Sequence, residues 1–304
     1  MKLDFDVVIV GAGFAGMTAA IYLKRANVNV VMIENNAPGG QANKTNIIEN
    51  YPGFESIDGP TLAYNLFMQT QKLKVPYKYG NVIDIEDKND YKIIKTDKEE
   101  IKCKCVIIAT GRKSKELGLE NETSLTGRGV SWCAICDGPL YKNKTVAVVG
   151  GGNSSLEESI YLSEMCSKVI LIHRRDEFRA ESILVDKVLQ NPKIEIKHNN
   201  VITALNEFED KLDSVDIKNT IDGSKENVKV SALFIFIGNY PVVDMLKNTK
   251  VKTMDGYILI DRNMRTNVKG IYACGDVISK EVYQMSTAAG EGTIAALSAI
   301  KDLK

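Results

Sequence analysis

The chain contains two segments of the same design, and this repetition constrains its fold more than any other feature of the sequence. Each segment begins with a short run of Val and Ile, passes through a glycine-rich turn and ends in residues whose apolar positions recur with helical spacing. The two segments read DVVIVGAGFAGMTAAIYLKRA and TVAVVGGGNSSLEESIYLSEM. A buried strand, a glycine turn and a helix in this order form the unit that binds a dinucleotide. The sequence therefore predicts an α/β fold with two Rossmann-like dinucleotide-binding domains.

Two further apolar runs indicate how these domains share the chain. One run, CKCVIIATG, precedes the second segment, and the other, GIYACGD, lies near the C-terminus ahead of a small-residue helix. Neither run has a role in the second unit, so both are assigned to the first. We expect a discontinuous first domain of residues 1–113 and 246–304, with a second domain of residues 114–245 inserted into it. The 304 residues are enough for two cores of ordinary size.

The first glycine turn carries the pattern of a phosphate-binding loop. Gly11, Gly13 and Gly16 form GxGxxG directly after a predicted strand, and Glu34 ends the next predicted strand. The glycines let the backbone approach a pyrophosphate at the helix N-terminus, and an acidic residue at this distance binds ribose hydroxyls. The turn could serve strand-to-helix packing alone, but the matching Glu34 favours a dinucleotide site.

The second glycine turn has the same pattern and a different ribose region. Gly150 and Gly152 are followed by Ser155, a small residue that still permits close helix packing. About twenty residues later, where an acidic ribose ligand is expected, the sequence has HRRDEFRA. The guanidinium groups of its three arginines match the geometry of a phosphate, which favours the 2′-phosphate of NADP over the bare ribose of NAD. These arginines are Arg174, Arg175 and Arg179. A solvated basic turn is the alternative interpretation.

A CxxC pair lies just before the second glycine turn. Cys133 and Cys136 in WCAICDG are spaced for a disulfide within one turn. Zinc would need four ligands, and the chain has no second CxxC and only two histidines, so no metal site is expected. The following Asp137 is typical of a turn, but dithiol exchange also needs an acid and base, and no histidine lies nearby in the sequence. We favour proton transfer for Asp137.

Composition narrows the class of protein. Lys+Arg and Asp+Glu both number 39, so no global charge attracts nucleic acid or an anionic membrane. Asp4 and Asp6 interrupt the stretch in which a signal peptide needs apolar residues, and the apolar run 7–23 is short for a membrane span. Cys103 and Cys105 alternate on a predicted strand and are expected to be packing residues. We expect a cytoplasmic protein that binds neither membrane nor nucleic acid.

Taken together, the motifs resemble those of the low-molecular-weight thioredoxin reductases of bacteria over essentially the whole chain. The shared motifs, in order, are GxGxxG, PGGQ with ENYPG, ATG, CxxCDG, GGGN, HRRxxFRA and a GD near the C-terminus. The resemblance implies an FAD-binding domain split by an inserted NADPH-binding domain that carries the dithiol. It also implies a homodimer that passes electrons from NADPH through FAD and the dithiol to thioredoxin. Cys136 would then face the flavin, Cys133 would attack the partner disulfide, and Asp137 would be the acid and base.

The same resemblance assigns residues to each cofactor. Those assigned to FAD are Gly11, Gly13, Phe14, Ala15, Gly16, Glu34, Gly40, Gln41, Asn50, Val82, Ala109, Thr110, Gly111, Gly275, Asp276, Gln284 and Met285. Those assigned to NADPH are Gly151, Gly152, Asn153, Ser154, Ser155, Glu158, His173, Arg174, Arg175, Arg179, Ile237 and Gly238.

The sequence also departs from the family pattern and leaves rivals open. Tyr283 stands where an arginine is common, Met285 where a small residue is usual, and Ile135 where threonine is usual. A reductase of another thioredoxin-like or glutaredoxin-like protein is the main alternative. The related ferredoxin-NADP reductases lack the CxxC, and a ferredoxin-fed disulfide reductase would lack the arginines. A non-catalytic redox sensor would not consume NADPH steadily.

Overall fold

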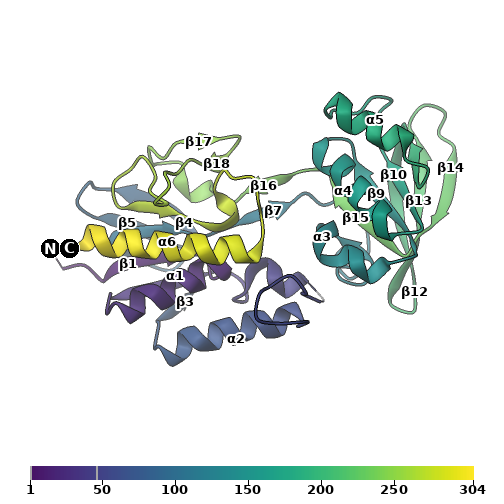
Figure 1. Cartoon of the computed structure of the whole chain (residues 1–304). Helices are drawn as coiled ribbons and strands as arrows, with labels where there is room; N and C mark the ends of the chain where they lie inside the picture. The colour runs from purple at the N-terminus through teal and green to yellow at the C-terminus, as the bar shows by residue number, and fades with distance from the viewer. Residues whose placement is uncertain (1, 46) are drawn as a thin grey trace. The chain divides into compact units, whose positions relative to one another are not determined.

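The computed structural model describes residues 2–45 and 47–304, which form two compact units (Figure 1). The first unit contains residues 2–44, 48–113 and 240–304, and the second contains residues 114–239 together with 45 and 47. The second boundary therefore lies at residues 239 and 240 rather than at 245 and 246. The reason is packing, because Val242, Met245 and Leu246 join the hydrophobic core of the first unit.

Two short strands carry the chain across these boundaries. Strand β7 (Arg112–Ser114) pairs with β16 (Asn239–Pro241). The main chain of Gly111 accepts a hydrogen bond from Val242 N at 3.1 Å, and the Thr110 hydroxyl donates to the Val242 carbonyl at 2.7 Å. These bonds fix the returning chain beside the ATG motif.

The first unit is built on a seven-stranded sheet. Its order is β3-β2-β1-β6-β5-β4, with β19 also paired to β6. The strands are β1 (Phe5–Val10), β2 (Val30–Glu34), β3 (Tyr77–Tyr79), β4 (Val82–Asp87), β5 (Lys92–Thr96), β6 (Glu100–Ile108) and β19 (Ile271–Ala273). Strands β3, β2, β1, β6 and β19 are parallel, whereas β5 is antiparallel to its neighbours. The two apolar runs assigned to this domain thus become β6 and β19, which are neighbours in the sheet.

Three helices complete the first unit: α1 (Phe14–Arg25), α2 (Gly59–Lys72) and α6 (Met285–Leu303). Helices α1 and α6 lie side by side (Figure 1). Their approach depends on Gly292, where a Cβ atom would lie 2.2 Å from the Ala15 carbonyl oxygen. Helix α2 begins at Asp58, whose carboxylate accepts the Thr61 amide at 2.8 Å as an N-cap. The shorter elements are η1 (Gly40–Lys44), η3 (Asp244–Leu246), β17 (Thr253–Met254), β18 (Tyr257–Ile258) and η4 (Gly275–Val277).

The second unit has a five-stranded parallel sheet with the order β11-β10-β9-β15-β8. These strands are β8 (Val130–Ser131), β9 (Thr145–Gly150), β10 (Lys168–Ile172), β11 (Ile194–Lys197) and β15 (Ala232–Phe236). An antiparallel meander follows β11 and consists of β12 (Asn200–Phe208), β13 (Lys211–Asn219) and β14 (Lys225–Lys229). The helices are α3 (Ala134–Asp137), η2 (Gly138–Tyr141), α4 (Asn153–Met165) and α5 (Ser182–Gln190).

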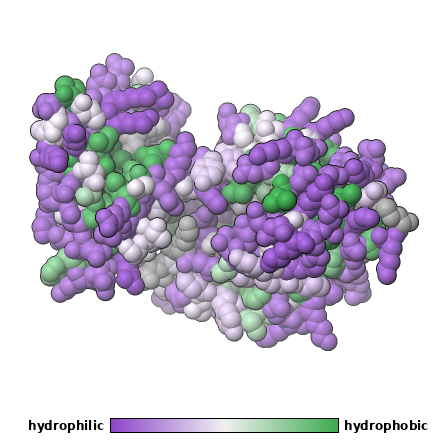
Figure 2. All heavy atoms as spheres, turned by 180° about the vertical axis from the view of Figure 1, so that it is seen from behind, coloured by the Kyte–Doolittle hydropathy of each residue, from purple (hydrophilic) through white to green (hydrophobic). Residues whose placement is uncertain are grey.

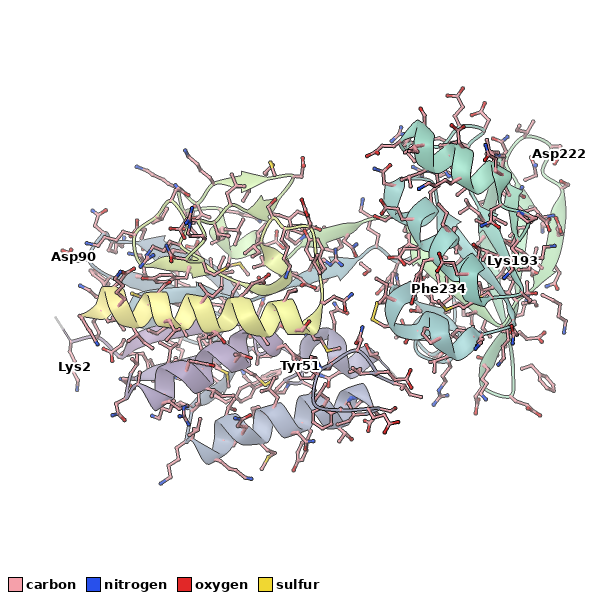
Figure 3. The ribbon with its side chains drawn as sticks, viewed as in Figure 1. Lys2, Tyr51, Asp90, Lys193, Asp222 and Phe234 are labelled. Carbon is pink, nitrogen blue, oxygen red and sulfur yellow. A yellow bond between two sulfur atoms is a disulfide. The ribbon has the colours of Figure 1, made fainter. Side chains whose placement is uncertain are left out.

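Side-chain alternation along β9 divides the core of this unit into two layers. Val146 and Val148 pack with Phe234, labelled in Figure 3, and with residues of the helices. Ala147 and Val149 point the other way and pack with residues of the meander. Because successive strand residues face opposite sides, one strand supports both layers.

Polar groups cover most of the face seen in Figure 2. Within residues 2–45 and 47–304, no helix has the length and apolar character needed to cross a bilayer. The apolar run near the N-terminus is divided between β1 and α1, as the sequence predicted.

The C-terminal helix is fastened by one charged group. The Asp302 carboxylate accepts two hydrogen bonds from the Arg265 guanidinium, at 2.8 and 2.9 Å, and one from the Tyr272 hydroxyl at 2.6 Å. The Tyr272 side chain is 1% exposed. The Arg265 guanidinium holds the pKa of Asp302 below its ordinary value.

We predict that Asp302→Ala destabilises the protein by about 1–3 kcal/mol at pH 7, because it leaves a buried hydroxyl and a guanidinium without their acceptor. A carboxyl whose pKa is depressed by folding stabilises the fold above its unfolded pKa and loses that contribution as the pH falls. The difference between variant and parent should therefore shrink towards acidic pH. Denaturant unfolding at several pH values measures it, with exposed Lys269→Ala as the control; a pH-independent difference would contradict the assigned role of the ion pair.

Candidate active site

The first glycine loop and the ATG motif lie against each other in the first unit. Gly11 has a φ of +104°, and a Cβ there would lie 2.3 Å from the Ala109 carbonyl oxygen. The Ala109 amide donates to the carbonyl of Val10 at 2.8 Å. The adjacency arises because β1 and β6 are parallel neighbours and both motifs follow their carboxyl ends.

Glu34 lies at the end of β2, beside this loop. One carboxylate oxygen accepts the Ala12 amide at 2.9 Å, and the other accepts the amides of Asn35 and Asn36, each at 2.9 Å. The predicted ribose ligand is thus held in a fixed orientation by main-chain donors. Gly40 is also close, since a Cβ on it would lie 3.4 Å from the Gly13 Cα.

Asp276 occupies a charged cluster at the end of β19. Its Oδ2 lies 3.7 Å from Arg112 Nε, and its Oδ1 lies 3.3 Å from Lys280 Nζ. Oδ1 is buried and accepts no hydrogen bond from the described part of the chain. Lys280 also contacts both oxygens of Glu291, at 2.9 and 3.0 Å, and Glu291 accepts the Gly275 amide at 2.8 Å. Such an orphaned oxygen fits a ligand hydroxyl.

Glu291 and Lys280 were missed by the sequence reasoning. Burial raises the pKa of Glu291, and the ion pair with Lys280 opposes that shift. The signal that could have identified Glu291 is its position as a lone charged residue within STAAGEGTIAALSAI. A charge on a small-residue helix face needs a partner when it is buried.

The other residues assigned to FAD fall around the same region. The Asn50 side-chain amide donates to Gln284 Oε1 at 3.4 Å, and the Gln41 side-chain amide donates to the Arg112 carbonyl at 3.0 Å. Gln284 is the N-cap of α6 and forms a reciprocal capping box with Thr287. The remaining members, Phe14, Ala15, Gly16, Val82, Gly111 and Met285, lie in α1, in β4, after β6 and at the start of α6. Val82 is buried in the core.

Tyr283, which departs from the family pattern, is part of the charged cluster. The Arg112 guanidinium lies 3.8 Å from the centre of its ring, and Lys280 Nζ lies 5.3 Å from it. The cation and the aromatic face attract each other. Tyr283 therefore provides Arg112 with an aromatic contact in this cluster.

The second glycine loop has the close packing that the sequence predicted. A Cβ on Gly150 would lie 2.6 Å from the Ser155 Cβ, and the Ser155 hydroxyl donates to the Gly152 carbonyl at 2.8 Å. Helix α4 begins here with Asn153 and Ser154. The side chain of Asn153 bonds both the amide and the carboxylate of Glu181, at 2.9 and 3.0 Å.

The three predicted phosphate ligands follow β10. Arg179 is placed directly beside the glycine loop, because its amide donates to the Gly151 carbonyl at 2.7 Å. Arg174 and Arg179 are exposed and Arg175 is half-buried. Across residues 2–45 and 47–304, none of these guanidinium groups forms an ion pair. Three unneutralised cations at one strand end suit a phosphate dianion.

Glu158, on α4, is the acidic residue among those assigned to NADPH. Burial raises its pKa to about 7, and the neighbouring Glu157 contributes to the shift. Its Oε2 is buried without a hydrogen-bond partner among the described residues.

The last two residues assigned to NADPH follow β15. Ile237 packs against the meander core. Gly238 has a φ of +112°, and its carbonyl accepts a hydrogen bond from the Lys115 amide at 2.9 Å.

The dithiol lies in the second unit, at the start of α3. Cys133 and Cys136 form a disulfide, and the Cys136 amide donates to Cys133 Sγ at 3.3 Å. Cys133 is the N-cap of this short helix. An amide that donates to sulfur favours the thiolate once the disulfide is reduced. The other cysteines, Cys103, Cys105, Cys166 and Cys274, are buried free thiols.

Asp137 follows Cys136 in the chain and is 9% exposed. Its Oδ2 accepts the Ser131 hydroxyl at 2.5 Å, and its Oδ1 is buried without a partner in the described ranges. Burial raises the pKa of Asp137, and the hydrogen bond from Ser131 opposes that shift. A carboxyl with these properties can hold a proton closer to neutral pH than an exposed one. Ser131 was not singled out from the sequence.

The chain as a whole matches known proteins. A family model described as pyridine nucleotide-disulphide oxidoreductase matches residues 5–292. A thioredoxin reductase from Bacillus subtilis is 43% identical over 294 residues, covering 97% of this chain and 93% of the relative. The chain belongs to the thioredoxin reductases of this family. A second thioredoxin reductase, from Mycoplasma genitalium, is 43% identical over 307 residues, with 99% and 96% coverage.

Comparison of the fold with solved structures also finds a thioredoxin reductase. The crystal structure of thioredoxin reductase from Streptococcus pyogenes superposes with a TM-score of 0.95 at 41% identity, covering 98% of each chain. The family resemblance, the α/β fold with two Rossmann-like sheets and the class of pyridine nucleotide-linked disulfide oxidoreductase are confirmed. The roles of individual residues stay predictions.

We predict that Asp137→Asn becomes more stable relative to the parent as the pH rises from about 4. Because folding raises the pKa of Asp137, the folded parent binds more protons than the unfolded chain at pH values above the ordinary pKa of an aspartate, and it loses stability as the pH rises through this window. The amide variant has no such loss. Denaturant unfolding of the oxidised protein at several pH values tests this, with exposed Asp90→Asn as the matched control. If the stability of Asp137→Asn relative to the parent fell as the pH rose, the raised pKa of Asp137 would be contradicted.

Proposed function

We propose that the protein is a thioredoxin-disulfide reductase that passes electrons from NADPH through FAD and the Cys133–Cys136 pair to thioredoxin. The observation that carries this proposal is the disulfide itself, formed at the start of a helix and backed by the buried carboxyl of Asp137. The thioredoxin reductases of Bacillus subtilis and Mycoplasma genitalium, which share 43% of their residues with this chain, support the choice of substrate.

We assign FAD to the first unit and NADPH to the second. Support for FAD comes from the glycine loop with Glu34 and from Asp276 Oδ1, which faces Lys280 but accepts no hydrogen bond within the described residues; these groups suit a ribose and a hydroxyl-rich chain. Support for NADPH over NADH comes from the three unpaired arginines after β10. When bound, FAD accepts a hydride from the nicotinamide and passes electrons on to a disulfide. The residues of this chain bind and orient the two cofactors.

The dithiol then exchanges with the substrate. The Cys133 thiolate attacks one sulfur of the thioredoxin disulfide, forms a mixed disulfide and releases one substrate thiolate. The Cys136 thiolate attacks Cys133 Sγ, which restores the protein disulfide and releases the second substrate thiolate. Asp137 supplies a proton to a departing thiolate and recovers one when the pair is reduced again. Ser131 keeps the carboxyl oriented through its 2.5 Å hydrogen bond.

The cellular compartment, the oligomeric state and the alternative substrate are also part of the proposal. Four buried free thiols suit a reducing compartment, and we propose the cytoplasm. We also propose a homodimer, as the family resemblance implies. A glutaredoxin-like substrate is the main alternative, and a panel of oxidised thioredoxins and glutaredoxins assayed with NADPH decides between them.

We predict that Cys133→Ser and Cys136→Ser each lower thioredoxin reduction by at least about 10³-fold, since exchange needs both sulfurs. Reduction of bound FAD by NADPH should persist, because it precedes exchange. Stopped-flow absorbance of the flavin and steady-state turnover separate the two steps. Buried Cys166→Ser is the control, and retained turnover in either dithiol variant would remove the pair from the mechanism.

We predict that Arg174→Gln and Arg175→Gln each raise the KM for NADPH by about 10-fold or more, since a lost hydrogen bond to a charged group costs about 1.5–3 kcal/mol. The KM for NADH should change little because NADH lacks the 2′-phosphate. Steady-state kinetics with both nucleotides measures this, with Arg262→Gln, in the first unit, as the charge-matched control. Equal damage with both nucleotides would mean that the arginines do not bind the 2′-phosphate.

A further inference from the structure

His173 directly follows strand β10 and is the first residue of HRRDEFRA, and the family resemblance assigned it to the nucleotide together with the arginines. The structure shows what surrounds its side chain. The ring is 7% exposed and lies against the glycine loop, where a Cβ on Gly151 would fall 2.0 Å from His173 Cε1. Only a glycine at residue 151 leaves room for this ring.

The same ring is tied to the loop that carries the arginines. His173 Nε2 lies 2.9 Å from the Glu177 carbonyl oxygen, at hydrogen-bond distance. The ring of Phe178 stacks on the imidazole with 5.2 Å between centroids and 29° between planes. One side chain therefore contacts both the glycine loop at 150–153 and the arginine loop at 174–181.

Main-chain bonds hold His173 itself in place. Its amide donates to the Lys197 carbonyl at 3.0 Å, and its carbonyl accepts the Asn200 amide at 2.9 Å. His198 supports the same loop from the other side, because its ring lies 5.0 Å from that of Phe178 and its Nδ1 lies 3.3 Å from the Arg175 carbonyl oxygen. The ring of His173 has little freedom to turn towards a ligand.

Further hydrogen bonds join the glycine loop to the arginine loop at two places. The Arg179 amide donates to the Gly151 carbonyl at 2.7 Å. Asn153, at the start of α4, and Glu181, at the start of α5, exchange hydrogen bonds of 3.0 and 2.9 Å.

The charge state of the ring also argues against a phosphate contact. Burial lowers the pKa of His173, and the nearby His198 and Arg175 lower it further, while backbone hydrogen bonds with Glu177 and Gly150 oppose them. The net direction is downward, so the ring is neutral at neutral pH. A neutral buried imidazole does not form an ion pair with a phosphate.

We propose that His173 is a positioning residue that sets the spacing between the pyrophosphate loop and the arginine loop without contacting the nucleotide. This proposal rests on the assignment of NADPH to these loops. The proposal predicts which nicotinamide dinucleotides each variant binds more weakly. Loss of the ring should weaken binding of any nicotinamide dinucleotide, with or without a 2′-phosphate, because both the pyrophosphate and the ribose depend on the spacing. Loss of an arginine should weaken only the phosphorylated one.

The test compares His173→Ala with Arg175→Gln in the full-length flavoprotein by calorimetric titration with NADP⁺ and with NAD⁺. We expect His173→Ala to raise the Kd for both nucleotides by a similar factor of about 10, a loss of about 1.4 kcal/mol. Arg175→Gln should raise the Kd for NADP⁺ alone. His173→Gln keeps an N–H that can reach the Glu177 carbonyl and should show a smaller loss with the same pattern.

A second readout needs no nucleotide. Amide hydrogen exchange over residues 150–153 and 177–181 should speed up in His173→Ala, most clearly at the Arg179 amide, and stay at the parent rate in Arg175→Gln. A His173→Ala variant that loses NADP⁺ binding alone would make the ring a phosphate ligand, and one that loses neither would remove it from the site; both results overturn the proposal. Failure of the NADPH assignment looks different, since Arg175→Gln would then leave NADP⁺ binding unchanged.

Discussion

Close approach of main chain to main chain, possible only where a side chain is missing, is the constraint on which the rest of this structure depends. A Cβ on Gly16 would lie 2.0 Å from the Gly11 carbonyl oxygen, and one on Gly11 would lie 2.3 Å from that of Ala109. These absent atoms let β1, α1 and the turn after β6 meet at one point. In the second unit a Cβ on Gly150 would lie 2.5 Å from the Phe236 carbonyl oxygen, and one on Gly151 would meet the side chain of His173. Each nucleotide loop is therefore part of the packing of its unit as well as a proposed ligand site.

Unsatisfied polar atoms mark the same places. Among the described residues, three buried side-chain atoms lack a hydrogen-bond partner, and all three are carboxylate oxygens: Asp137 Oδ1, Glu158 Oε2 and Asp276 Oδ1. A buried acceptor without a donor costs stability, so a fold retains it where something else uses it. Asp137 follows the CxxC pair in the chain, Glu158 lies on α4 after the second glycine loop, and Asp276 lies after β19. They coincide with the proposed proton carrier and the two proposed cofactor sites.

Much of this arrangement could be predicted because it depends on local sequence. A strand that ends at glycines and leads into a helix has one common outcome, and a CxxC pair is close enough to bond within a turn, so both units and the disulfide followed from the sequence. The second domain boundary was placed too late because Val242, Met245 and Leu246 resemble any apolar segment until the core that receives them is known. Glu291, Lys280 and Ser131 were missed because their partners lie on other elements and no motif names them.

The sequence by itself determined the two strand, turn and helix units, the family and the CxxC pair, and it supplied the prediction that arginines replace an acidic ribose ligand. These are patterns of residue type at fixed spacing, and their chemistry depends on neighbours in the chain. Only the tertiary structure decided that Asp276 belongs to a cluster with Lys280 and Glu291, that Asp137 is buried against Ser131, and that the imidazole of His173 lies between two loops. Burial and orientation depend on elements that are distant in sequence, and they determine which charge a side chain carries and what it can reach.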